Sequence, residues 1–77
     1  MELIIISPEG ELLNETADRI TLPGSMGAFS VLKNHAPLVS TLERGSIIYI
    51  QKKKEKSYEI EGGVIVIEQD IVRVMVE

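Results

Sequence analysis

The apolar residues of this chain occur in short runs, and this pattern restricts the fold more than any other feature. Each run is four to six residues long, is rich in Ile and Val, and is interrupted by Gly, Pro or Asp. A helix that buries one face needs apolar residues spaced three and four apart over about ten or more positions. No stretch supplies that spacing, so the sequence predicts no helix. Short strands with turn signals at near-regular intervals are typical of an all-β sandwich or barrel.

Turn-forming residues divide the chain into its predicted strands. Pro8 and Gly10 mark the first turn, because Pro fixes φ and Gly accepts a positive φ. The polar run 52–56 lies between two strand-like runs and is predicted to form a hairpin tip. The predicted strands are 3–6, 11–16, 17–22, 38–42, 46–51, 58–61, 64–67 and 72–77. We expect the aliphatic core to include Ile5, Ile20, Leu22, Ile48, Val66 and Val74.

Length and composition exclude several classes of protein. The 77 residues make a single domain, with 44% hydrophobic residues, no Cys and a formal net charge of −4. A dedicated nucleic-acid binder normally has a basic surface, so nucleic acid is not an expected partner. No apolar run approaches the roughly 18 residues of a transmembrane helix. The start of the chain has no basic region, so a signal peptide is not expected.

The stretch 23–38 is the least repetitive part of the chain and is predicted to be one long connection. Gly24 and Gly27 permit backbone conformations closed to other residues, and Pro37 keeps Ala36 out of the helical region. Most connections in a small domain are short, and long ones are usually functional. The sequence therefore places the candidate functional site in this stretch.

None of the residues that could carry chemistry forms a recognisable active site. His35 is the only histidine, and no adjacent nucleophile or carboxylate is evident to orient it for catalysis. It can serve the turn structurally or contact a partner. The glycines near residue 24 are followed by neither Gly-Lys-Ser/Thr nor a helix, so a phosphate-binding loop is not predicted. We expect no catalytic residues, no cofactor and no metal site.

The lysine-rich run 52–56 permits two interpretations. It could bind phosphate or acidic lipid headgroups, or it could be a solvated hairpin tip that keeps strand edges from pairing with other chains. The second interpretation is the simpler one.

Residues 23–38 closely resemble the signature of the epsilon subunit of the rotary proton-translocating ATP synthase, the delta subunit in mitochondria. The matching pattern is Pro-Gly-x-x-Gly-x-Phe-x-Val-Leu-x-Asn-His-Ala-Pro-Leu. Four shorter pieces match in the same order along the chain, namely 6–10, 42–45, 62–64 and 72–77. Together the five pieces make the resemblance specific.

The resemblance implies a two-sheet β-sandwich of roughly ten short strands. It also implies a non-catalytic central-stalk subunit that fixes the gamma subunit to the rotor ring, so that proton-driven rotation is coupled to ATP synthesis. The subunit would be peripheral to the membrane, on the cytoplasmic face in bacteria or the corresponding face in organelles. The loop residues expected to face the ring are Ser25, Met26, Ala28, Lys33 and His35.

This chain departs from the family pattern at several places. Relatives often have Pro or another residue at the position of Lys33, and some have an acidic residue at that of Ala28, so an ionic contact at Ala28 is not expected. Many relatives have Gly where this chain has Ser30; if that Gly uses a positive φ, the loop here must have a different shape. Typical relatives also continue into two C-terminal helices that can inhibit hydrolysis and bind ATP. The sequence given ends at Glu77, so neither property is expected of it.

Two other functions remain as alternatives to the one that the family resemblance implies. One is a free-standing ligand-binding or scaffold β-domain, and the other is a small enzyme that uses His35.

Overall fold

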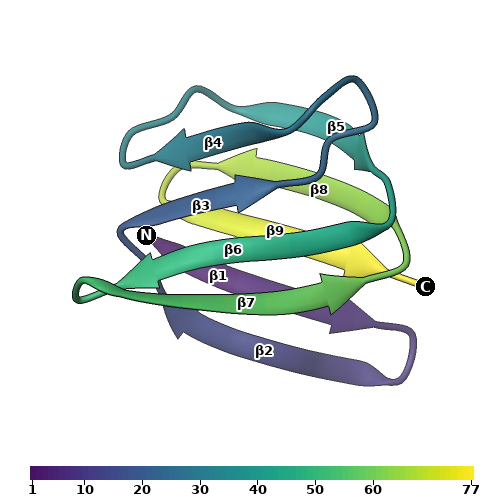
Figure 1. Ribbon diagram of the computed structural model, residues 1–77. Coiled ribbons are helices and arrows are strands. Elements are labelled where there is room, and N and C mark those ends of the chain that lie inside the picture. The colour runs from purple at the N-terminus through teal and green to yellow at the C-terminus, as the bar shows by residue number, and fades with distance from the viewer.

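The computed structural model describes all residues from Met1 to Glu77 and contains nine β-strands and no helix (Figure 1). This confirms the predicted all-β class. With no helix present, the structure has no helical segment that could span a membrane. The strands are β1 (Glu2–Ser7), β2 (Gly10–Thr16), β3 (Arg19–Leu22), β4 (Phe29–Leu32), β5 (Leu38–Leu42), β6 (Gly45–Gln51), β7 (Lys54–Ile60), β8 (Gly63–Glu68) and β9 (Ile71–Val76).

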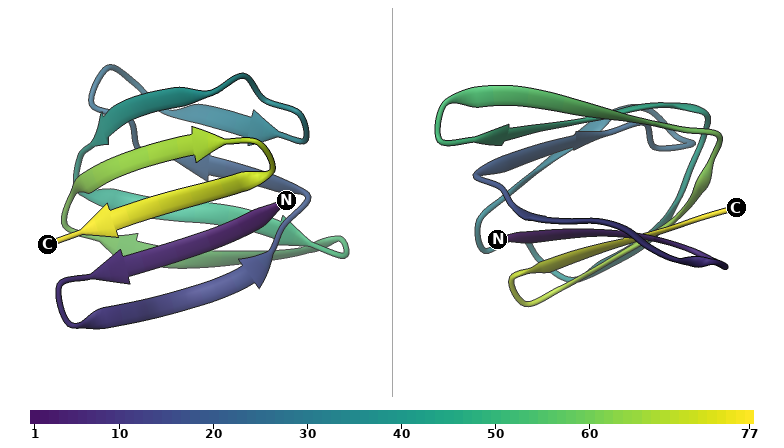
Figure 2. Two further views of the ribbon diagram at one scale, coloured as in Figure 1. Left: turned by 180° about the vertical axis from the view of Figure 1, so that it is seen from behind. Right: turned by 90° about the horizontal axis from the view of Figure 1, so that it is seen from below.

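The strands form two sheets that face each other, so the predicted sandwich is confirmed. One sheet has five strands in the order β2-β1-β9-β8-β5, and the other has four in the order β4-β3-β6-β7. The view from below in Figure 2 shows them as two layers. Edge strands β4 and β5 lie along one side of the sandwich, and β2 and β7 lie along the other (Figure 1).

The first and last strands are neighbours in the middle of the five-stranded sheet. β1 pairs with β9 in parallel, with Glu2 opposite Ile71 and Ile5 opposite Val74. Every other strand pair is antiparallel. A parallel pair needs a long crossover, and here the crossover includes the whole four-stranded sheet.

The core lies between the sheets and is almost entirely aliphatic. Of the predicted core residues, Ile5, Ile20, Leu22 and Val74 are buried as expected. The buried residues are Leu3, Ile5, Ala17, Ile20, Leu22, Val31, Leu42, Ile47, Tyr49, Ile60, Ile65, Ile67, Val72 and Val74.

The prediction that Ile48 and Val66 belong to the core is wrong. Their neighbours Ile47 and Ile65 are fully buried, and alternation along a strand turns Ile48 and Val66 to the outer faces, where both are half-buried. Both strands have apolar residues on their two faces, so the pattern of side chains does not reveal which face is inside.

The prediction of one long connection over residues 23–38 is also wrong, because β4 interrupts it. Phe29 and Val31 turn inward, and Ser30 lies opposite Thr21 of β3. This strand has only four residues between Gly27 and Asn34, which is too short for alternation to be visible in the sequence. The stretch therefore consists of two turns, one at each end of an edge strand.

Candidate functional site

The first turn of the predicted site, residues 23–28, leaves the four-stranded sheet and is fixed to β5 of the five-stranded sheet. The backbone contacts are an isolated antiparallel bridge between Gly24 and Leu42, Ser25 N–H to Thr41 O at 3.0 Å, and Glu43 N–H to Pro23 O at 2.8 Å. The Thr41 hydroxyl also donates to Ser25 Oγ at 2.9 Å. The turn thus joins the two sheets along the β4–β5 side and has a defined position.

Two glycines allow the turn to be this tight. A Cβ atom at Gly24 would lie 2.6 Å from Gly27 O and 2.8 Å from the Phe29 ring, so the buried backbone leaves no space for a side chain. Gly27 has a φ of +125°, which disfavours residues with a side chain, and its N–H donates to Gly24 O at 2.9 Å. Gly27 thus has the unusual backbone conformation expected from the sequence, whereas Gly24 has no positive φ and is needed for space.

The turn presents Met26 to solvent. The Met26 side chain is 99% exposed, and its neighbours Ser25, Gly27 and Ala28 are also exposed. Met is flexible and polarisable and is common at adaptable protein contacts. An apolar side chain held out from a fixed turn is suited to contact with another protein.

The second turn contains Lys33 and His35 and lies at the other end of β4. Asn34 has a φ of 67°, and the His35 N–H donates to Leu32 O at 3.1 Å. His35 Nδ1 lies 2.6 Å from Ala36 O and donates to it, so the half-buried ring is oriented by the backbone rather than by a carboxylate.

The structure divides the five predicted contact residues into two groups. Ser25, Met26 and Ala28 share the first turn, whereas Lys33 and His35 share the second. The four residues of β4 between them span roughly 13 Å. A partner that touches both groups must therefore extend along the β4–β5 side of the sandwich.

Ser30 does not reshape this region. It lies within β4 without a positive φ, and its hydroxyl is 3.0 Å from Thr21 Oγ1 and 3.4 Å from Arg19 Nη2. A serine at this position thus fits an ordinary strand conformation.

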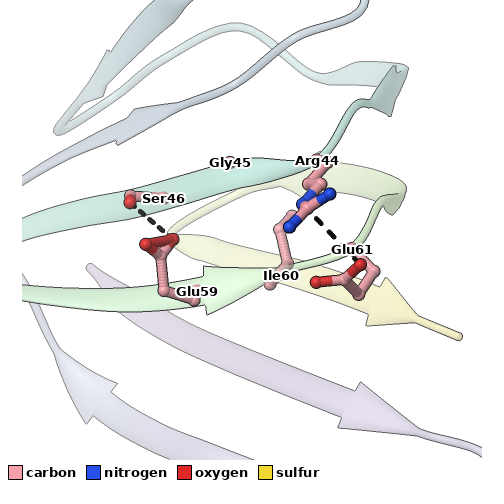
Figure 3. A pocket seen from close by; sticks show the side chains of 6 residues that line it. All are labelled: Arg44, Gly45, Ser46, Glu59, Ile60 and Glu61. Carbon is pink, nitrogen blue, oxygen red and sulfur yellow. Dashed lines mark hydrogen bonds and ion pairs between the residues drawn. The ribbon is translucent and has the colours of Figure 1, made fainter.

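A shallow pocket of about 430 Å³ lies at the β5–β6 and β7–β8 turns (Figure 3). The Ser46 hydroxyl donates to Glu59 Oε2 at 2.6 Å, and Arg44 Nε lies 3.8 Å from Glu61 Oε1. The Arg44 and Glu61 side chains are about four-fifths exposed, so water solvates this pair. The pocket includes none of the predicted site residues, and no three His, Asp or Glu side chains in the chain gather as metal ligands would.

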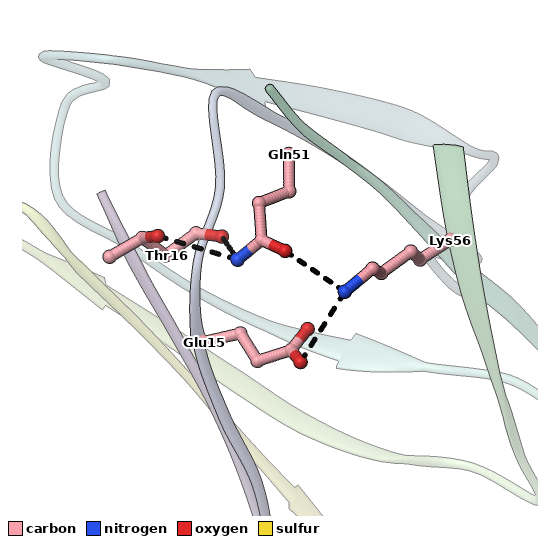
Figure 4. Close-up of polar contacts among 4 residues, drawn as sticks. All are labelled: Glu15, Thr16, Gln51 and Lys56. Carbon is pink, nitrogen blue, oxygen red and sulfur yellow. Dashed lines mark hydrogen bonds and ion pairs between the residues drawn. The ribbon is translucent and has the colours of Figure 1, made fainter. Parts of the chain in front are cut away.

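Four polar residues join β2 to β6 and β7 on the opposite side of the sandwich (Figure 4). We name them the polar clasp: Glu15, Thr16, Gln51 and Lys56. Lys56 Nζ lies 3.6 Å from Glu15 Oε1 and donates to Gln51 Oε1 at 2.9 Å. Gln51 Nε2 donates to Thr16 O at 3.0 Å. Burial, and then the nearby Glu15 carboxylate, raise the pKa of Tyr49 to about 12. No local pattern in the sequence indicated this cluster, because Thr16 and Gln51 are far apart along the chain.

Comparison with known proteins identifies the family. The model of the ATP synthase delta/epsilon chain, beta-sandwich domain, matches residues 1–77. The chain belongs to this family. The match confirms the resemblance to the ATP synthase epsilon subunit that the sequence motifs indicated.

Epsilon chains from several sources are similar over the whole sequence. The ATP synthase epsilon chain of Desulfitobacterium hafniense (strain DSM 10664 / DCB-2) is 36% identical over 75 residues, which is 97% of this chain and 57% of the relative. The epsilon chain of Leptospira borgpetersenii is 36% identical over 77 residues, which is 100% of this chain and 61% of the relative. The plastid epsilon chain of Prototheca wickerhamii is 36% identical over 76 residues, which is 99% and 57%. This chain thus spans about three-fifths of the length of these epsilon chains.

Two solved structures share the fold of this epsilon-family chain. A chain of the Euglena gracilis mitochondrial ATP synthase, in a complex of OSCP, F1 and c-ring, matches with a TM-score of 0.87 at 23% identity, over 96% of this chain and 48% of its own length. A chain from the structure of the Tetrahymena thermophila mitochondrial ATP synthase central stalk and c-ring matches with a TM-score of 0.78 at 17% identity. The match covers 97% of this chain and 61% of the other.

Proposed function

We propose that this chain is the β-sandwich of an ATP synthase epsilon subunit that joins the central stalk to the rotor ring. The family assignment over residues 1–77 supports the subunit. The observation that carries the contact is the first turn, which is fixed to β5 by backbone hydrogen bonds and holds Met26 99% exposed. A turn that is already fixed loses less conformational freedom when a partner binds it, which supports this turn as the contact.

The ring contact extends along the β4–β5 side of the sandwich. Met26 and Ala28 would pack against the ring at one end of β4, while Lys33 and His35 would contact it at the other. Fully exposed apolar groups gain most from burial on assembly, so Met26 is placed at the centre of the contact.

A second surface is available for the gamma subunit on the outer face of the five-stranded sheet. The registers bring apolar residues of four adjacent strands together on that face, with Arg73 as its cation. An apolar face of this extent is characteristic of a protein interface. The apolar residues are Ile4, Ile6, Val39, Val64, Val66 and Met75.

In this arrangement the domain acts mechanically. The gamma subunit would hold the sheet face and the ring would hold the β4–β5 side, so torque passes between them through a hydrogen-bonded β-sandwich. The chain would be peripheral to an energy-transducing membrane, on the side of the catalytic head. Relatives in bacteria and plastids support such a location. The family match over the whole chain disfavours a free-standing ligand-binding module.

The test uses an ATP synthase stripped of its epsilon subunit and rebuilt in vesicles with variants of this chain. We expect the free energy of unfolding of the Met26→Glu/Ala28→Lys variant to lie within about 0.5 kcal/mol of that of wild type, since both residues are exposed. It should bind the gamma subunit but join the ring weakly and reduce proton-driven ATP synthesis. Met26→Leu should support synthesis normally, and His35→Ala tests the second turn. Undiminished synthesis by the Met26→Glu/Ala28→Lys variant would place the ring contact elsewhere.

A further inference from the structure

The turn between β6 and β7 carries three adjacent lysines, Lys52–Lys54, which we name the cationic tip. All three are exposed and form no ion pair, although the chain has 12 carboxylate side chains for 8 Lys and Arg. The three ion pairs use Arg44, Lys56 and Arg73, and the remaining two cations, Arg19 and Lys33, are single charges outside the tip. The three lysines of the tip are therefore free to contact a partner, although the protein as a whole is acidic.

The backbone of the cationic tip is not the one that lysine favours. Lys52 and Lys53 are the two central residues of the hairpin turn, with φ values of 50° and 69°. A two-residue turn with both φ values positive is the type I′ turn, for which Asn-Gly is preferred. A Cβ atom opposes this conformation. Lysines thus occupy both central positions of the turn, although residues such as Asn and Gly adopt this conformation more easily.

Contacts with the five-stranded sheet and its connection to β3 hold the cationic tip in place. Asp18 Oδ2 accepts the Lys52 N–H at 3.2 Å, and the Asp18 N–H donates to Ile50 O at 2.7 Å. Gln51 and Lys56, on either side of the tip, belong to the polar clasp with β2. A charge group fixed before binding loses less conformational freedom when a partner arrives.

We propose that the cationic tip docks on a carboxylate-rich protein surface within the rotary assembly. The inference rests on the proposed function but concerns a different contact. The tip lies at the start of β3, beside Asp18, whereas Met26 lies beyond the end of that strand. The tip would steer the chain toward its partner and fix its orientation, which is the usual effect of charged groups at the rim of an interface.

Two observations favour protein carboxylates over an anionic membrane or a nucleic acid. Adhesion to an anionic membrane is typical of clusters of roughly four to eight Lys and Arg, and the rest of this chain has a negative excess that such membranes repel. Nucleic-acid binding uses a basic stripe with aromatic residues, which the tip lacks.

The test measures how fast the 77-residue chain joins an epsilon-stripped ATP synthase from the same organism, over a range of salt concentrations. Replacing Lys52, Lys53 and Lys54 by Gln should slow association roughly tenfold at low salt and flatten its salt dependence. Replacing all three by Arg keeps the charge and should leave the rate near wild type. Lys52→Asn/Lys53→Gly should melt at the same or a higher temperature yet still associate slowly, which separates charge from folding.

Each outcome decides the inference. If wild type joins the complex and the Gln variant joins it equally fast, with the same salt dependence, the docking role is overturned and the proposed function stands. If wild type does not join the complex at all, the proposed function fails and the docking role with it. Tip-dependent binding to phosphatidylserine vesicles or to a single-stranded oligonucleotide, without an effect on the complex, would assign the tip to a different partner.

Discussion

Lys56 of β7 and Glu15 of β2 form an ion pair between the edge strands of two different sheets, with Nζ 3.6 Å from Oε1. The two sides of the sandwich are thus closed in different ways. Backbone hydrogen bonds from the first turn to β5 join the sheets on the β4–β5 side, whereas side chains of the polar clasp join them on the other.

We expect the Lys56–Glu15 pair to stabilise the fold only modestly. Both side chains are about a third exposed or more, and ion pairs of this kind typically contribute about 0.2–1 kcal/mol. A double-mutant cycle with Lys56→Met and Glu15→Gln, read by urea unfolding, measures the coupling free energy. The coupling should shrink at high salt. A coupling above about 2 kcal/mol would show that the pair is effectively buried.

The Tyr49 phenol should titrate at unusually high pH. Burial and the neighbouring Glu15 raise its pKa from the ordinary value of 10.0 to about 12, so the neutral form is favoured in the folded state. In a Tyr58→Phe variant, phenolate absorbance should report Tyr49 alone, with a midpoint near 12 in the folded protein.

The same shift predicts how stability depends on pH. Because the folded pKa is raised, the stabilisation is present below pH 10 and is lost as pH rises toward 12. Relative to Tyr49→Phe, the free energy of unfolding should fall by at most about 1.4 kcal/mol per pH unit in that window. Parallel profiles for the two proteins would contradict the shift.

The corrected core assignment predicts a sharp contrast between neighbouring residues. Ile47→Ala and Ile65→Ala should each cost about 2–5 kcal/mol, because both side chains are fully buried between the sheets. Ile48→Ala and Val66→Ala, on the outer faces, should cost clearly less. Thermal unfolding of the four variants tests the strand register; equal losses at residues 47 and 48 would show that the register is wrong.

Gly24→Ala should damage the first turn. The new methyl group would meet Gly27 O at 2.6 Å and the Phe29 ring at 2.8 Å, and overpacking of this kind typically costs about 1–3 kcal/mol. Met26→Ala is the matched control in the same turn, because the Met26 side chain touches solvent and should change stability by under about 0.5 kcal/mol. Calorimetric melting of both variants measures the difference; a Gly24→Ala protein as stable as the control would show that the turn can relax.

The sequence predicted eight of the nine strands because the signals for them are local, but it missed β4, and β7 begins at Lys54, inside the predicted hairpin tip 52–56. Pro8, Gly10 and the pair Gly62-Gly63 interrupt the chain where the structure turns, and residues 38–42 form a strand with the predicted bounds. The inside face of β6 and β8 was not predictable, since Ile47 and Ile48 are equally apolar. Only the opposite sheet decides which of them is buried.

The local features of the candidate site could also be predicted from the sequence, whereas its contacts between distant segments could not. Gly24 and Gly27 indicated an irregular segment, and the structure has a turn there in which Met26 is exposed. The separation of His35 from Met26 depends on the pairing of β4 with β3, and the polar clasp depends on β2 lying beside β7. Such contacts between distant segments leave no pattern within a short window of sequence.

The parallel pairing of β1 with β9 also determines when this domain can fold during translation. Glu2 is opposite Ile71, so the centre of the five-stranded sheet joins the first strand of the sandwich to the ninth. Until β9 has left the exit tunnel, β1 has one unfilled edge and Val72 and Val74 are missing from the core. Contacts this distant in sequence are slow to form, and exposed strand edges are sites of aggregation. During translation the sandwich therefore cannot complete its central sheet until β9 has emerged, and the edge of β1 stays exposed until then.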